Sequence, residues 1–187
     1  NVAGKKITYA DYYSQLGLLM SHVHKIQLPQ FGYIGHGTGN HASLLNYIDR
    51  DIDMFFGRIE PIMDKIALDI EVFKEKIFEG LEAISQLSHV LTHNDLSPNN
   101  VMLDSKGELV LIDWDNAVSH VWINDFGVMT YWMRYRHQNE SEREEFIRLF
   151  LASYKADMSH SEIRKLEKIL HLIQALNLLG YYYFDDN

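Results

Sequence analysis

The sequence contains no cysteine among its 187 residues. Without thiols the chain forms no disulfide, binds no metal through thiolate sulfur and carries out no thiol redox chemistry. This absence is compatible with a reducing compartment, where proteins rarely rely on disulfides. The function classes that depend on cysteine are therefore excluded.

Long apolar segments are also missing from the sequence. No run reaches the roughly 18 consecutive apolar residues of a membrane-spanning helix. The first residues do not show the charged region followed by an apolar region that marks a secretion signal. We therefore expect a cytoplasmic protein with no membrane partner.

Positive charge is scarce relative to negative charge. The chain has 17 Lys and Arg residues against 26 Asp and Glu residues, and its formal net charge at pH 7 is −9. A nucleic-acid-binding protein needs a basic face to offset phosphate charge, so we expect no nucleic-acid partner. The acidic balance suits a cationic or metal-bridged ligand, or it serves only to keep the domain in solution.

Apolar side chains are abundant enough for one folded domain, since 47% of the residues are hydrophobic. Apolar residues recur at the i, i+3, i+4, i+7 spacing of a helix over residues 9–25. Similar patterns predict helical segments at 43–58 and 73–84. The glycine-rich stretch 28–41 separates the first two helices and is predicted to be a loop.

Two S-x-x-E motifs predict further helix starts in the last third of the chain. Ser141 with Glu144 and Ser159 with Glu162 each stand just ahead of an apolar periodic run. In such a capping box the serine and glutamate side chains satisfy backbone N–H groups at the start of a helix.

One region departs from the helical pattern. Residues 90–113 read VLTHNDLSPNNVMLDSKGELVLID, with apolar runs at 101–103 and 109–112 around a turn at 104–107. These features predict a loop followed by a β-hairpin. Because the strands of a hairpin are short and antiparallel, polar residues before and after them converge in space. The residues concerned are His93, Asp95, Asn100 and Asp113.

Three of these residues have the spacing of the protein-kinase catalytic loop, His-x-Asp-x-x-x-x-Asn. In that loop the aspartate receives the proton of the substrate hydroxyl, and the asparagine binds a magnesium ion. A second metal-binding aspartate is then expected across the hairpin. Asp113, 18 residues after Asp95, has that position.

The letters Asp125-Phe126-Gly127 spell the magnesium-binding triplet of protein kinases, but their position argues against that role. They lie 30 residues after Asp95, beyond the hairpin, in a segment whose aromatic and apolar spacing is helical. We therefore predict that Asp113, and not Asp125, is the functional counterpart of the metal-binding aspartate.

The segment THNDLSPNNVMLDSKGELVLIDWDNA, residues 92–117, resembles the catalytic segment of the aminoglycoside phosphotransferase and choline kinase superfamily. Members of that superfamily are small-molecule kinases with a protein-kinase fold. The later WINDFGVMTYW is similar to the family's following helix, which begins with a structural aspartate, here Asp125. SQLGLLMSHVHKIQLPQFGYIG, residues 14–35, resembles the helix and loop that follow the hinge between the lobes in many bacterial members.

The resemblance implies a mainly helical α+β fold, namely the C-terminal lobe of a protein-kinase-like fold with a small catalytic β-hairpin. It also implies an ATP-dependent phosphotransferase that moves the γ-phosphate to a hydroxyl of a small molecule, with Mg²⁺ as the metal. Asp95 would be the catalytic residue, and Asn100 and Asp113 would bind magnesium. His93 would support the backbone of the catalytic loop.

Two further residues of this segment have open roles. Asp115 would either contact a metal-bound water or cap the next turn. Ser97 stands at a position that is often histidine in the family, so its role does not carry over.

The residues VAGK at 2–5 resemble the strand that carries the nucleotide-binding lysine of kinases. If Lys5 were that lysine, a glutamate-bearing helix and further strands should follow, whereas the sequence continues with a helix and a glycine-rich loop. We therefore expect residues 1–187 to form only the C-terminal lobe, without the N-terminal nucleotide-binding lobe. Such a lobe is expected to be inactive, or nearly so, by itself.

Two alternative functions stay open from the sequence. A noncatalytic kinase-like binding module would share the fold, although the presence of Asp95, Asn100 and Asp113 counts against it. A metal-dependent phosphohydrolase would need a tighter His/Asp cluster than this spacing suggests. Its candidate residues are His93, Asp95, Asp113 and Asp115.

The acidic triplet Asp49-x-Asp51-x-Asp53, followed by Glu60, imitates the ligand spacing of a calcium loop. That loop needs glycine at its sixth position, where this chain has Met54. We predict an exposed acidic helix face instead.

The acceptor of the phosphate is not specified by the sequence. The acidic and aromatic residues YYYFDDN at 181–187 would attract an amine through charge and cation–π contacts, or would form the end of a helix packed on the core. Aminoglycosides, choline-like alcohols, sugar amines and amino alcohols are all compatible with it.

Overall fold

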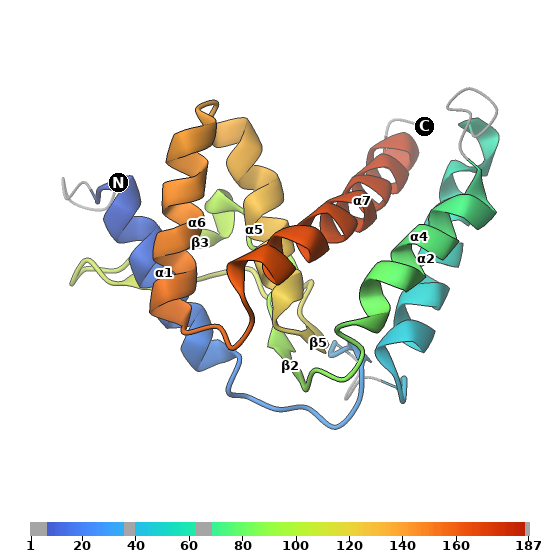
Figure 1. The fold of residues 1–187 in the computed structure, drawn as a ribbon, viewed down its shortest axis with the longest axis horizontal. Helices are drawn as coiled ribbons and strands as arrows, with labels where there is room; N and C mark the ends of the chain where they lie inside the picture. The colour runs from blue at the N-terminus through green and yellow to red at the C-terminus, as the bar shows by residue number, and fades with distance from the viewer. Residues whose placement is uncertain (1–6, 36–39, 63–68, 186–187) are drawn as a thin grey trace.

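The structure is a computed structural model that describes residues 7–35, 40–62 and 69–185, and in the helices it leaves out the side chains of residues 62 and 182–185 (Figure 1). The VAGK motif lies outside the described residues. The helices are α1 (Tyr9–Val23), α2 (Leu44–Ile59), α4 (Ile70–Glu82), α5 (Ile123–Arg136), α6 (Glu140–Tyr154) and α7 (His160–Asp185), with 3₁₀ turns η1 (Glu60–Ile62) and η2 (Pro98–Asn100). The strands are β1 (Gly32–Tyr33), β2 (His89–Thr92), β3 (Val101–Leu103), β4 (Leu109–Leu111) and β5 (Val118–Val121).

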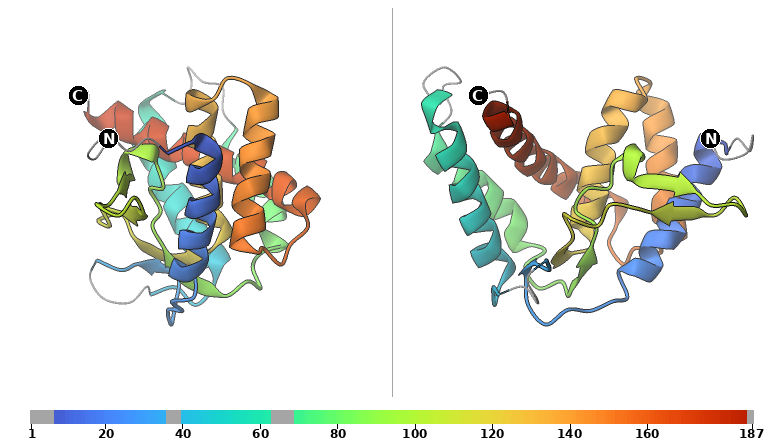
Figure 2. Two further views of the ribbon diagram at one scale, coloured as in Figure 1. Left: turned by 90° about the vertical axis from the view of Figure 1, so that its left-hand side faces the viewer. Right: turned by 180° about the vertical axis from the view of Figure 1, so that it is seen from behind.

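The helices form two groups, with a small sheet at their junction (Figures 1 and 2). One group contains α1, α5 and α6, and the other contains α2 and α4. The long helix α7 contacts α5, α2 and α4, so it joins the two groups. The predicted mainly helical α+β fold is confirmed. Among the described helices, none is long and apolar enough to cross a membrane.

Helix α1 follows the apolar pattern of the sequence. Thr8 caps it by accepting the backbone N–H of Asp11 at 3.1 Å, which satisfies one of the donors left free at a helix start. The predicted range of 9–25 is confirmed to within two residues, because the helix ends at Val23. The residues that the helix buries are Tyr13, Leu16, Gly17 and Met20.

One of the two predicted capping boxes is present. The backbone N–H of Glu162 donates to Ser159 Oγ at 3.3 Å, and the N–H of Ser159 donates to Glu162 Oε2 at 3.0 Å. The box predicted at Ser141 is wrong. Asn139 caps α6 instead, accepting the N–H of Ser141 at 2.9 Å, since asparagine is at least as good an N-cap as serine and lies two residues earlier. Glu144 pairs with an arginine of α7.

Helix α2 contains the acidic triplet, as predicted. Asp49 and Asp53 are exposed and form ion pairs with Lys74 of α4, the pair with Asp49 at 3.4 Å. Asp51 lies on another face of the helix and forms a hydrogen bond with Tyr47. The three acidic residues therefore belong to a helix and not to a calcium-binding loop.

Two sheets position the predicted site. The hairpin of β3 and β4 is confirmed, with Met102 opposite Val110. The antiparallel sheet of order β1-β5-β2 was not predicted. Its strands are two to four residues long, and β5 is buried at every position, so it shows no alternation of polar and apolar residues. Pairing of Thr92 with Val118 holds the end of β2 directly before the predicted catalytic loop.

Candidate active site

Asp125 anchors the loop that carries Asp95. Its carboxylate is fully buried near the start of α5, where Oδ2 accepts the backbone N–H of His93 at 2.8 Å and Oδ1 accepts the N–H of Asn94 at 2.7 Å. Hydrogen bonds to an ionised acceptor are stronger than neutral ones. These contacts hold the loop backbone and fit the structural role that the resemblance implies for Asp125.

Two side chains from distant helices complete this buried network. Nε2 of His24, just after α1, donates to Asp125 Oδ2 at 3.1 Å, and its Nδ1 lies 2.9 Å from the hydroxyl of Tyr154 at the end of α6. Burial raises the pKa of Tyr154, so its hydroxyl keeps its proton and donates to His24. The catalytic loop is thereby connected to α1 and α6.

Asn94 gives the loop its sharp turn. Its backbone is left-handed, with φ of 62°, a conformation that asparagine adopts more readily than most residues. Its side-chain Oδ1 accepts a hydrogen bond from Asn124 Nδ2 at 2.9 Å. The turn brings Asp95, the next residue, to the wall of a pocket.

Asp95 and Asn100 are in direct contact. Nδ2 of Asn100 donates to the backbone oxygen of Asp95 at 2.9 Å and to its carboxylate Oδ2 at 2.8 Å. This arrangement leaves Oδ1 of Asp95 and Oδ1 of Asn100 available for other partners. The carboxylate is half-buried, so solvent and a ligand can both reach it.

His93 ties the loop to the hairpin. Its buried ring donates from Nε2 to the backbone oxygen of Ile112 at 2.8 Å and lies with its centre 4.7 Å from the ring of Trp114. These contacts fit the supporting role expected for His93: Nε2 is bound to the backbone, and Nδ1 is buried without a hydrogen-bond partner among the described residues.

Asp113 lies two residues after the end of β4 and is exposed. Its backbone is left-handed, with φ of 61°, and within the described parts of the chain its carboxylate has no hydrogen-bond or ion-pair partner. The N–H of Ile112 donates to the backbone oxygen of Asn100 at 3.0 Å, so the residues that precede and follow the hairpin lie side by side, as predicted. A free carboxylate and a carboxamide oxygen are hard donors that suit Mg²⁺, which binds through few protein ligands and keeps waters and phosphates. The residues present therefore fit the expected metal.

The two residues with open roles differ in their contacts: the backbone of Ser97 is bonded to Asp95 and Asn100, whereas the side chain of Asp115 is not part of the site's hydrogen bonds among the described residues. Ser97 is buried at the start of η2, where its backbone oxygen accepts the N–H of Asn100 at 3.1 Å. Asp115 is exposed in the turn after Trp114, and within residues 7–35, 40–62 and 69–185 its side chain caps nothing.

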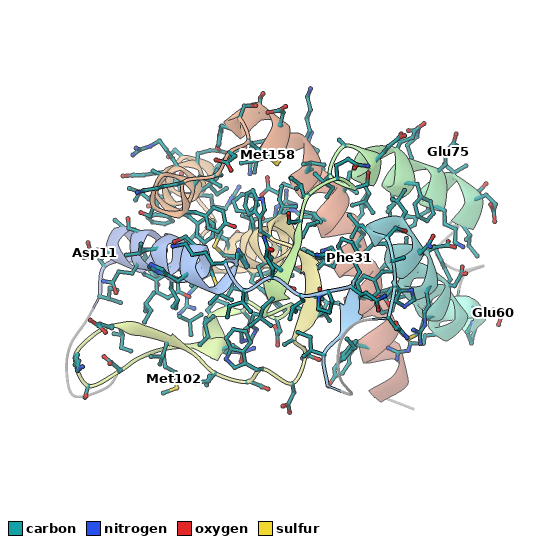
Figure 3. The ribbon with its side chains drawn as sticks, turned by 90° about the horizontal axis from the view of Figure 1, so that it is seen from below. Asp11, Phe31, Glu60, Glu75, Met102 and Met158 are labelled. Carbon is teal, nitrogen blue, oxygen red and sulfur yellow. The ribbon has the colours of Figure 1, made fainter. Side chains whose placement is uncertain are left out.

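The hairpin presents an apolar face next to the metal-binding candidates. Met102, Val110 and Ile112 are between 37% and 44% exposed, an unusual degree for large apolar side chains. Met102 pairs with Val110, and Ile112 lies two residues after Val110, so the three side chains share one face of the hairpin. Figure 3 shows Met102 on the outer side of the hairpin, away from the helices.

A pocket of about 460 Å³ opens beside Asp95. Three helices form most of its wall, each through residues that recur at helical spacing. Helix α2 contributes Tyr47, Asp51 and Arg58, helix α5 contributes Asn124, Val128 and Trp132, and helix α7 contributes Gln174, Asn177 and Tyr181. Of the segment YYYFDDN, Tyr181 is the residue whose side chain is described, and it lines this pocket.

Burial sets the protonation of two groups in the pocket wall. It raises the pKa of Asp51, against the lowering effects of the hydrogen bond from Tyr47 and of nearby Arg50. It lowers the pKa of His120 to about 4, so this histidine is neutral at pH 7.

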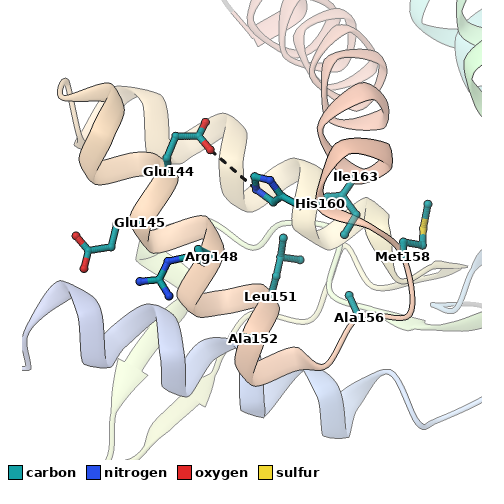
Figure 4. A pocket seen from close by; sticks show the side chains of 9 residues that line it. All are labelled: Glu144, Glu145, Arg148, Leu151, Ala152, Ala156, Met158, His160 and Ile163. Atoms are coloured by element: carbon teal, nitrogen blue, oxygen red, sulfur yellow. Dashed lines mark ion pairs between the residues drawn. The ribbon is translucent and has the colours of Figure 1, made fainter.

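A larger hollow of about 830 Å³ lies elsewhere, between α6 and the start of α7 (Figure 4). Glu144 and His160 line it, with Glu144 Oε2 and His160 Nε2 4.0 Å apart. It contains none of the predicted site residues. The pocket at Asp95 is therefore the candidate substrate site.

Several residues of the site were not predicted from the sequence. His24 and Tyr154 gave no local signal, because His24 is 101 positions from its partner Asp125 and Tyr154 is 130 positions from its partner His24. Asp51 was visible only as part of an acidic helix. Its spacing of four residues from Tyr47 and seven from Arg58 is the signal that places all three on one helix face.

The geometry agrees with comparisons to known proteins. A profile of the phosphotransferase enzyme family matches residues 10–160. The fold is similar to that of choline kinase LicA from Streptococcus pneumoniae, with a TM-score of 0.62, 18% identity, and coverage of 95% of this chain and 56% of that one. An ethanolamine kinase of Plasmodium vivax gives a TM-score of 0.66 at 14% identity over 98% of this chain and 57% of that one.

A third similar structure is the ADP-bound aminoglycoside phosphotransferase APH(2'')-Ib, with a TM-score of 0.61, 18% identity, and coverage of 98% of this chain and 64% of that one. Identities this low establish a shared fold alone. This chain spans 56% to 64% of the length of the three structures. The profile match covers most of the chain and shows that it belongs to the phosphotransferase enzyme family.

Proposed function

We propose that this protein transfers the γ-phosphate of ATP to a hydroxyl of a small molecule that binds in the pocket between α2, α5 and α7. One observation carries the proposal: Asp95, on a loop fixed by Asp125, borders a pocket of about 460 Å³. Pockets of this size are typical of small-molecule sites. Family membership and kinase-like relatives support the same reaction class.

Asp95 is the residue that orients the acceptor hydroxyl and receives its proton. Asn100 holds one carboxylate oxygen through its Nδ2, so Oδ1 of Asp95 is left for the acceptor. Positioning of this kind accounts for much of the catalysis in phosphoryl transfer, where the protein has little covalent chemistry to perform. The loop anchored on Asp125 supplies the rigidity that positioning requires.

Asn100 and Asp113 would hold Mg²⁺, which would supply positive charge to offset the negative charge of the ATP phosphates. The exposed apolar face of Met102, Val110 and Ile112 lies beside these residues and would cover a flat heterocycle such as adenine. The relative with bound ADP supports ATP as the phosphate donor. The proposal includes a nucleotide-binding lobe outside residues 1–187 that supplies the phosphate-binding lysine.

The two alternatives have less support. A metal-dependent phosphohydrolase needs a cluster of histidine and carboxylate ligands, and among the described residues no three His, Asp or Glu side chains come together as a metal site. A noncatalytic binding module would not require the arrangement seen at Asp95. There the carboxylate is held by Asn100, and the loop that carries it is anchored by the buried Asp125.

The direct test is ATP consumption by the full-length protein that carries this chain, with magnesium and a panel of hydroxyl compounds. We expect consumption that depends on one class of acceptor. Asp95→Asn should lower kcat by about 10²- to 10⁴-fold, the usual contribution of a positioned acid or base, with little change in the Kd of magnesium-ATP. Acceptor-dependent turnover that survives Asp95→Asn would contradict the assignment of the site.

A further inference from the structure

The wall of the acceptor pocket carries few charges. Among the described residues that line it, the charged ones are Asp51, Arg58 and Asp95. Asp51 and Arg58 lie on the same helix face, seven residues apart, and their opposite charges offset each other. His120 is neutral because it is buried. Apart from Asp95, the charges of the described residues that line the pocket therefore cancel.

The polar groups that remain open in this pocket are mostly side-chain amides. Asn116 accepts from the hydroxyl of Tyr33 at 3.4 Å, and Asn124 donates to Asn94. Among the described residues, the NH₂ group of Asn116 and the side-chain oxygen of Asn124 have no hydrogen-bond partner. Gln174 and Asn177, half-buried on α7, form no hydrogen bond within the part of the chain that the structure describes. The pocket thus offers both donors and acceptors.

This mixture matches hydroxyl groups better than ammonium groups. A hydroxyl donates one hydrogen bond and accepts others, so it can pair with either end of an amide, whereas an ammonium group only donates. A ligand with several positive charges would bury them beside Arg58 and beside amide donors, and unpaired buried charges are costly. Each additional amine of a polycation would therefore weaken binding here.

Resting on the proposed function of this pocket, we infer that the acceptor is a neutral polyhydroxylated molecule of the sugar type. The amides of Asn116, Asn124, Gln174 and Asn177 bind its hydroxyl groups while Asp95 orients the one that reacts. This narrows the range of acceptors that the sequence left open, and it excludes polyamines such as the aminoglycosides.

The test is calorimetric binding to the full-length protein at low ionic strength, with probes paired by charge. One pair is kanamycin and its fully N-acetylated derivative, and the other is glucosamine and N-acetylglucosamine. We expect the neutral member of each pair to bind at least about tenfold more tightly. Tighter binding of the amine in both pairs would overturn the inference, and so would failure of every sugar probe to bind.

Two variants connect the preference to the pocket. Asn177→Leu keeps the size of the side chain but removes the amide that would bind a hydroxyl group, so the neutral sugar should bind about fivefold more weakly.

Arg58→Gln removes the charge that offsets Asp51. It should shift the ratio of the affinities for the neutral and the amine probe about tenfold toward the amine. Arg148→Gln, which removes an arginine from α6 outside this pocket, is the matched control and should leave the ratio unchanged. An unchanged ratio in Arg58→Gln would contradict the charge argument.

Transfer of phosphate is measured in a separate experiment. The proposed kinase reaction and the inferred preference for a neutral sugar can therefore be contradicted independently. Preferential binding of neutral sugars without ATP consumption would sustain the inference about the ligand and count against the kinase. Acceptor-dependent ATP consumption with a preference for kanamycin over its acetylated form would sustain the kinase and overturn the inference.

Discussion

Asp125 and Asp113 are both aspartates beside the same loop, and their partners give them different roles. Asp125 is fully buried and accepts two backbone N–H groups, whereas Asp113 is exposed and, within the described residues, holds no protein group. A carboxylate engaged with buried donors cannot also bind a solvated ion, so Asp125 serves as an anchor. Of the two aspartates, Asp113 is the one whose exposed carboxylate is available for the proposed binding of magnesium.

This anchoring predicts the effect of Asp125→Asn. The amide has one acceptor oxygen and no charge, so at least one of the N–H groups of His93 and Asn94 loses its partner. We expect the free energy of unfolding to fall by about 1 to 3 kcal/mol, the cost of a buried unsatisfied donor. Denaturant unfolding measures this change.

The positioning role of Asp125 needs a kinetic readout as well. In the full-length enzyme we expect Asp125→Asn to lower kcat more than it raises the KM of the acceptor, because the loop that holds Asp95 loosens. Asp115→Asn is the stability control, since this exposed aspartate makes no hydrogen bond with any described residue, and it should change the unfolding free energy by less than about 0.5 kcal/mol. An Asp125→Asn protein as stable as Asp115→Asn would refute the anchoring.

At the residue scale, the spacing of His93, Asp95 and Asn100 was enough to predict the loop, because the contact between Asp95 and Asn100 is local. Asn100 reaches Asp95 across five residues. His24 and Tyr154 were beyond prediction, since hydrogen bonds between distant helices leave no periodic pattern in the sequence.

Among the elements, α1 and α6 pack so closely that a glycine is needed between them. A Cβ atom at Gly17 would lie 2.3 Å from the backbone oxygen of Phe150, a separation that real atoms do not adopt. Backbone atoms cannot turn aside as a flexible side chain can. The spacing of α1 and α6 matters for the site because both helices carry residues that support Asp125.

Gly17→Ala should therefore destabilise the protein. Overpacking of a tight contact costs about 1 to 3 kcal/mol, and the clash with backbone places this variant at the upper end. Gly57→Ala on α2 is the matched control, because no described atom lies within 4 Å of the added methyl group. That variant should gain about 0.5 to 1 kcal/mol from helix propensity. Equal unfolding midpoints for the two variants would contradict the packing.

At the scale of elements, the helices were largely predictable because their apolar stripes are long. The short strands were not. β5 has four residues that are all buried, and β1 has two, so neither is long enough to show a period. The cap of α6 was misassigned because Asn139 and Ser141 are both good caps, and the sequence does not tell which one the backbone uses.

Across the whole molecule, the acceptor pocket exists only because α7 joins the two groups of helices. Tyr47, Asn124 and Asn177 line it together although they are far apart in the chain. No local sequence pattern predicts that these three helices line one pocket. The kinase-like fold was predicted from the sequence chiefly through the catalytic motif, with support from the similar segments at 14–35 and around Asp125.

Buried histidine makes the stability of the whole molecule dependent on pH. Burial lowers the pKa of His120 from its ordinary 6.5 to about 4 in the folded protein. On acidification the unfolded chain binds this proton first, so the folded state loses stability as the pH falls from 6.5 to 4 and is unaffected above that window. His171, also buried and with a pKa lowered to about 4, acts with the same sign.

We expect the free energy of unfolding to fall by roughly 2 to 3 kcal/mol per histidine across that window, as measured by urea unfolding at a series of pH values. His120→Asn keeps an acceptor for the N–H of Val121 and removes the titration, so its pH dependence should be flatter. A slope identical to that of the unsubstituted protein would show that His120 is not the source.

The central claim is that phosphate moves from ATP to an acceptor hydroxyl at Asp95. It is tested most directly by following the label from γ-labelled ATP in the full-length protein with magnesium and a mixture of neutral and amino sugars. The account predicts that the label appears on a sugar hydroxyl and that Asp95→Asn abolishes this transfer. Label released only as inorganic phosphate, or transferred equally well by Asp95→Asn, would contradict it.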